Sequence, residues 1–177
     1  NQANANNNSD NFTAKIDHTF SPRDMFSGRT VWRPNASFDP FNRSFIPFFG
    51  ATTANFEILS ALRYTRTLAA NKILELNASF SRRTNNQGFP DNANTNWQEL
   101  TGFLGGTLNP VAVGAPQIEV TGYTILGHAY DLPKIWSYNN YQYGGVYTWI
   151  RGAHSVKAGG DFLRAQYFSR NYGDTRG

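Results

Sequence analysis

The chain has 177 residues and no cysteine, so it is long enough for one domain and contains neither disulfides nor thiolate metal sites. Aromatic residues make up 15% of it and charged residues only 16%, a balance that argues against intrinsic disorder. The mean hydropathy of −0.52 and the lack of any long apolar run exclude a bundle of transmembrane helices. The net charge of +4 comes from scattered Lys and Arg, so we expect no nucleic-acid partner.

Three hairpins with short turns are predicted in chain order. Each arm has roughly 9–13 residues, the length that a tilted strand needs to cross a bilayer. Ser and Pro open the first connection, Ser21–Asp24, which is typical of a type I turn. The paired arms are Phe12–Phe20 with Met25–Arg33, Asn55–Thr67 with Lys72–Arg82, and Tyr138–Ile150 with Ser155–Phe168.

Two long connections separate the hairpins, Pro34–Ala54 and Thr84–Ile135. Both exceed the usual loop length of a compact soluble domain. Strictly alternating short and long connections are typical of outer-membrane barrels, with short periplasmic turns and long extracellular loops. The sequence therefore predicts an all-β, antiparallel up-and-down fragment of a transmembrane β-barrel, with about six strands.

Residues i and i+2 of a strand share a face, so the two faces of each arm can be compared. One face carries the aromatic and aliphatic residues, and charges appear on it only near arm ends, as Arg66, Arg82 and Arg164. A Lys or Arg at the midplane of a bilayer costs about 2–4 kcal/mol, and close to 0–1 kcal/mol near its surface. The opposite face is predicted to line the lumen and carries Lys15, Asp17, Arg29, Arg33, Glu57, Arg63, Glu75, Lys157 and Asp161.

A secreted β-sandwich that binds carbohydrate is the alternative fold and function. It also alternates apolar and polar residues, but its core is normally dominated by Val, Ile and Leu, with turns of similar length at both ends. An enzyme, such as a hydrolase barrel of the outer membrane, is a third hypothesis, but no nucleophile–base pair appears in the sequence. We therefore expect no enzymatic activity.

Two hairpins resemble those of a known family. Asn11–His18 with Phe20–Asp24 and Ser27–Arg29, and the run Gly152–Arg164 with its Gly-Gly-Asp-Phe strand, resemble barrel hairpins of TonB-dependent outer-membrane receptors of the Oar-like branch. Val120–Tyr123 through Leu126-Gly127 is similar to the segment that precedes the second of these. The motifs follow one another over nearly the whole chain.

The resemblance implies a barrel of about 22 strands whose lumen is blocked by a plug. It implies residence in the cell outer membrane and energised uptake of a bulky, scarce ligand such as a siderophore or an oligosaccharide. Its expected partners are outer-membrane lipid, the plug of the same full-length chain, the TonB complex, and an unknown small-molecule, sugar or peptide ligand. Residues 1–177 would be an internal part of the barrel domain, without plug, TonB box, signal peptide or C-terminal strand.

The sequence predicts neither a cofactor nor a metal site. His18, His128 and His154 have no partners at ligand or triad spacing. Ligand contact is expected in the long connections, because binding residues concentrate on loops held by a rigid scaffold. These aromatic side chains could equally pack the loops against one another. The candidates are Phe38, Phe41, Phe45, Phe48 and Phe49 in the first connection and Trp97, Tyr123 and Trp136 in the second.

Overall fold

The computed structural model describes residues 3–90, 97, 100, 102 and 114–172. Strands dominate these residues, and a short 3-10 helix, η1 (Pro47–Phe49), precedes β4. The strands are β1 (Asn6–Ser9), β2 (Phe12–Ser21), β3 (Asp24–Asp39), β4 (Ala51–Ala69), β5 (Lys72–Gly88), β6 (Lys134–Arg151) and β7 (His154–Asn171).

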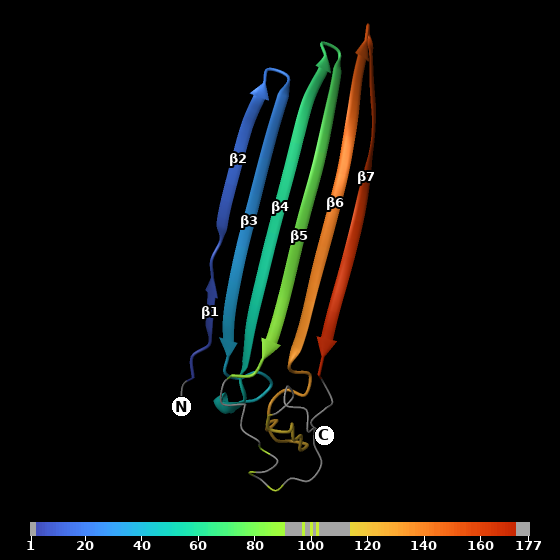
Figure 1. The fold of residues 1–177 in the computed structure, drawn as a ribbon. Coiled ribbons are helices and arrows are strands. Elements are labelled where there is room, and N and C mark those ends of the chain that lie inside the picture. The colour runs from blue at the N-terminus through green and yellow to red at the C-terminus, as the bar shows by residue number, and fades with distance from the viewer. Residues whose placement is uncertain (1–2, 91–96, 98–99, 101, 103–113, 173–177) are drawn as a thin grey trace.

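All seven strands belong to one antiparallel sheet (Figure 1). Strands β3 to β7 follow one another across the sheet, and β1 and β2 both pair with β3, one after the other along its length. Each long strand is therefore a neighbour of the next strand in the chain, which is the up-and-down connectivity that the alternating connections predicted.

The three hairpin turns lie where the sequence placed them. Each leaves two residues unpaired, between the pairs Ser21–Asp24, Ala69–Lys72 and Arg151–His154. In the first turn the Ser21 hydroxyl accepts a hydrogen bond from the Arg23 amide at 3.1 Å and donates one to the Asp24 carboxylate at 2.7 Å. Local polar side chains thus close this turn, as its composition indicated.

The strands extend further than the sequence predicted. The predicted ends at Arg33 and Arg82 are wrong, because β3 continues to Asp39 and β5 continues to Gly88. β4 and β6 begin correspondingly early, and β1 is a seventh strand in a segment that was not predicted to be one. These extensions contain several Asn residues, which are depleted in strands, and they are held by pairing with the neighbouring strands.

The register aligns the predicted faces across the whole sheet. Paired residues share a face, and the chains of pairs Ile16–Gly28–Leu62–Ala78–Tyr143–Phe162 and Asp17–Ser27–Arg63–Asn77–Gly144–Asp161 run from β2 to β7 on opposite faces. We call the first the outer face and the second the inner face. The split between apolar and charged residues therefore continues from strand to strand.

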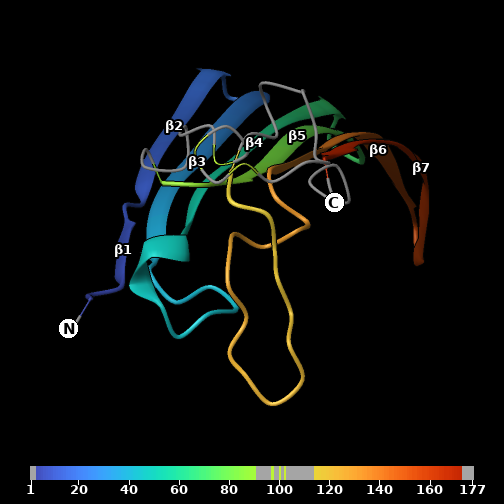
Figure 2. The same cartoon turned by 90° about the horizontal axis from the view of Figure 1, so that it is seen from below.

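The sheet is curved, and the connections at one end fold over its concave side (Figure 2). A cavity of about 280 Å³ there is lined by Thr53, Gln87 and Lys134 of the inner face together with Asn42 and Arg43 of the β3–β4 connection. The inner face is therefore the concave one. This is the curvature that a barrel with a charged lumen requires.

Nothing in the described part of the chain covers the apolar outer face along the middle of the strands. Leu62 and Phe162 keep 48% and 62% of their surface exposed, and the few buried apolar residues are Val31, Ala115, Ala129 and Leu132. A β-sandwich would cover such a face with a second sheet, whereas all described strands lie in one sheet. Among the described residues, no helix has the length and apolarity to span a membrane.

Candidate ligand-binding wall

The inner face carries all nine charged residues that the sequence assigned to it. The register places Asp17, Arg63 and Asp161 in one row across the sheet, and the other six lie on the same face. Arg33 and Glu57 pair across strands at 3.5 Å, and Lys15 pairs with Asp17 along β2 at 2.6 Å. These side chains are about half exposed or more, so each pair contributes little to stability, and their charge remains accessible from the concave side.

A ladder of asparagine side chains crosses the inner face near the loop end. Asn35 donates to Asn7 at 2.6 Å, Asn55 donates to Asn35 at 3.2 Å, and Asn85 donates to Asn55 at 2.5 Å. The four amides thus connect β1, β3, β4 and β5. Only 7% of Asn85 is exposed, and its carbonyl oxygen has no hydrogen-bond partner among the described residues.

An aromatic group continues this ladder on β6 and β7. Trp136 pairs with Asn85 in the register, and its ring lies 5.4 Å from that of Tyr138, which lies 4.5 Å from that of Tyr167. The guanidinium of Arg83 lies 5.7 Å from the centre of the Trp136 ring. The inner face therefore offers amides, a cation and aromatic rings side by side at the loop end.

The position of Trp136 corrects the sequence prediction. Trp136 was assigned to a long loop, but it belongs to β6 and lies on the inner face. Phe38 was also assigned to a loop, but it lies in β3 and pairs with Thr52 on the outer face. Both assignments were wrong because the strands continue into segments whose Asn and Ser content is typical of loops. The period-two spacing of Trp136 and Tyr138 was the signal that could have placed both rings on one face of a strand. We call the inner face, with its charges, asparagine ladder and aromatic rings, the wall.

The other loop candidates separate into two sets. Phe48 and Phe49 of η1 pack edge-on against each other at 5.5 Å, and Trp97 lies 5.5 Å from Phe48 and 6.4 Å from Phe49. These three rings pack the connections together. Phe41, Phe45 and Tyr123 are exposed, at 39%, 86% and 80%, and Phe48 also keeps 42% of its surface exposed, so these four are the accessible aromatic candidates.

His128 belongs to the packed core of the connections. It is fully buried, its Nδ1 accepts a hydrogen bond from the Ala115 amide at 3.1 Å, and the rings of Phe49 and Phe89 lie 5.4 and 4.8 Å away. Within the described part of the chain, no three His, Asp or Glu side chains are grouped as a metal site would need.

Ion pairs fix the connections over the concave side. The carboxylate of Asp131 lies 3.3 Å from the Arg43 guanidinium and 3.4 Å from the Lys134 ammonium. Asp131 thereby ties the β3–β4 connection to the start of β6. The Ser44 hydroxyl also donates to the Ile125 carbonyl at 2.8 Å. The connections therefore partly cover the inner face at its loop end.

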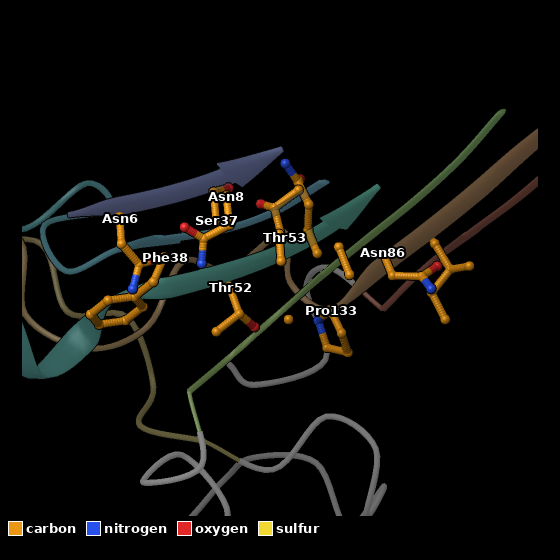
Figure 3. Close-up of a pocket in the computed structure, with 13 residues that line it drawn as sticks. Asn6, Asn8, Ser37, Phe38, Thr52, Thr53, Asn86 and Pro133 are labelled. Carbon is orange, nitrogen blue, oxygen red and sulfur yellow. The ribbon is translucent and has the colours of Figure 1, made fainter. Parts of the chain in front are cut away.

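Another open cavity of the inner face lies further toward the turns. About 540 Å³ in volume, it is lined by Lys15, Arg29 and Arg63 together with Asn77 and Ser79. A different cavity of about 460 Å³, lined by Asn8, Asn86 and their neighbours, opens on the outer face near the loop end (Figure 3). It cannot be part of a lumen.

These observations define a class of protein, a transmembrane β-barrel with a polar lumen wall and an apolar outer wall. A family model of the outer membrane beta barrel domain matches residues 1–177, and the chain belongs to that family. Comparison with curated proteins and with solved structures gave no match. The family confirms the predicted barrel fold and the location in the cell outer membrane.

Proposed function

We propose that the chain is part of a TonB-dependent outer-membrane receptor that takes up a bulky, scarce ligand through a plugged lumen. The observation that carries the proposal is the wall: charges, the asparagine ladder and aromatic rings share the concave face, and the connections fold over its end. A passive lumen needs only water-compatible side chains, whereas this one concentrates hydrogen-bonding and stacking groups at the entrance.

The open form of the sheet fits a barrel with more strands than those described. Six long strands form a curved sheet whose two edges, β2 and β7, do not approach each other in Figure 2. Barrels that enclose a plug have about 22 strands, and a lumen of that size is blocked only by another folded element. The resemblance of Gly152–Arg164 to receptor hairpins supports the same class.

The test uses the full-length protein that contains this chain, purified in detergent and placed in planar bilayers. We expect binding to the periplasmic domain of TonB and a closed lumen with no steady conductance. A constantly open pore together with no TonB binding would overturn the proposal, because both are properties of a passive porin.

A further inference from the structure

Two arginines of the outer face, Arg82 and Arg164, lie equally far from the turn ends of their strands. Ten residues separate Lys72, the start of β5, from Arg82, and ten separate His154, the start of β7, from Arg164. Ten strand residues rise about 33 Å along the strand, which is about 23 Å across a membrane at a tilt of 45°. The apolar band of a barrel is about 25 Å tall. Both arginines therefore lie at the membrane surface opposite the turns, on the side of the long loops.

Aromatic side chains lie directly below both arginines. Phe80 and Phe162 precede them by two residues on the same face, and Tyr141 of β6 pairs with both Phe80 and Arg164. The rings of Phe80 and Tyr141 lie 5.0 Å apart. Aromatic girdles mark the boundary of the lipid in barrels, so these rings place the guanidinium groups at the level of the headgroups.

The environment of these arginines differs from that of Arg66, an outer-face arginine near the turns. The Arg66 Nε lies 3.5 Å from the Asp24 carboxylate, which also accepts the Tyr64 hydroxyl at 2.5 Å. Within the described residues, Arg82 and Arg164 form no ion pair. Two unpaired guanidinium groups at headgroup depth favour an anionic partner from the membrane.

Polar groups lie beside the two arginines, in addition to the aromatic ones. Asn139 pairs with Arg82 in the register on one side and with Gln166 on the other, and its buried Oδ1 has no hydrogen-bond partner within the described part of the chain. Four residues beyond Arg82 on β5, Asn86 lines the outer-face cavity together with Asn6 and Asn8 (Figure 3). This surface continues past the lipid boundary to the height where the glycan of a headgroup would lie.

We propose that this surface binds a phosphorylated glycolipid of the outer leaflet. Arg82 and Arg164 bind phosphate groups by charge-assisted hydrogen bonds, and the asparagine cavity receives the sugars, whose hydroxyl groups match amides as both donors and acceptors. The arginines are two residues apart along the strand direction and two strand spacings apart across the sheet, on the order of 12 Å. They can therefore engage separate phosphates of one headgroup. The site is independent of the lumen and of TonB.

The experiment measures binding of purified lipopolysaccharide to the detergent-purified full-length protein. An Arg82→Gln/Arg164→Gln variant is expected to bind roughly thirtyfold more weakly, since each arginine near a membrane surface contributes about 1 kcal/mol and 1.4 kcal/mol is tenfold in affinity. Arg66→Gln is the matched control, because it removes an outer-face arginine at the other membrane surface, and it should leave the affinity unchanged.

Lipopolysaccharide stripped of its phosphates provides a second arm on the unaltered protein, where we expect a similar loss. Equal affinity for the phosphorylated and stripped lipids, or an unchanged affinity in the double variant, overturns the proposal. If the double variant does not assemble, the comparison of the two lipids decides alone. TonB is absent from this assay, so failure of the transport proposal leaves its outcome unaffected.

Discussion

The outer and inner faces of this sheet share one backbone but meet different solvents, and this difference explains their composition. The outer face presents Leu62, Tyr143 and Phe162 in one register row, whereas the inner face presents Arg63 and Asp161 in the adjacent row. Lipid tolerates no unpaired charge at mid-depth, whereas a wet lumen tolerates charges, amides and rings alike. The residue types of the outer face thus depend on their depth in the membrane. Those of the inner face depend on the hydrogen bonds among their own side chains.

The largest expected effect comes from placing a charge at mid-depth on the outer face. Leu76→Arg should block assembly of the full-length barrel, because Leu76 lies four residues from the start of β5, where an arginine costs about 2–4 kcal/mol. Ser79→Arg on the inner face of the same strand should be tolerated. Heat-modifiable migration of outer-membrane fractions measures both, and equal behaviour of the two variants would contradict the face assignment.

Two adjacent glycines of β7 test how closely the faces are packed. A β-carbon on Gly159, on the inner face, would collide with the Gly145 carbonyl oxygen, whereas one on Gly160, on the outer face, meets nothing within 4 Å. We expect Gly159→Ala to lower the free energy of unfolding by about 1–3 kcal/mol and Gly160→Ala to leave it nearly unchanged. Thermal unfolding of the full-length protein in detergent provides the measurement. Similar unfolding midpoints of the two variants would show that β6 and β7 move apart enough to accommodate the added methyl group.

The asparagine ladder offers a sharper comparison within the loop end. Asn55→Ala removes two hydrogen bonds and leaves the buried Asn85 amide without its remaining partner, so a loss of about 1–3 kcal/mol is expected. Asn86→Ala changes the exposed outer-face residue that follows Asn85 in sequence and should lower the free energy of unfolding only slightly. The same thermal assay distinguishes the two variants. An Asn55→Ala variant of unchanged stability would mean that water replaces the hydrogen bonds that Asn55 makes.

The smallest effect is expected for the exposed ion pairs of the inner face. Arg33→Gln removes a 3.5 Å pair whose side chains are 52% and 48% exposed, so it should cost no more than about 1 kcal/mol. Raising the salt concentration should reduce the difference further. A larger loss that persists in high salt would indicate that Arg33 contacts another part of the full-length chain.

The sequence determined the hairpins, the turn positions and the two faces, because each depends on neighbours in the chain. Side-chain alternation has a period of two, so Lys15 and Asp17 had to share a face, and Ser21-Pro22 had to favour a turn. The outer-membrane class followed from the same alternation, since the cost of a charge at mid-depth explains why Arg82 and Arg164 appear only ten residues from the turn ends of their strands. The family of the chain agrees with that prediction.

The tertiary structure alone decided where the strands end and which side chains meet. Asn35, Asn55 and Asn85 are typical of loops in isolation, but pairing between β3, β4 and β5 aligns them into a ladder and extends the sheet to Gly88. The same pairing moves Trp136 from a predicted loop to the inner wall. Asn is depleted in strands, so the conformation of these asparagines is fixed by hydrogen bonds to strands that are distant in sequence.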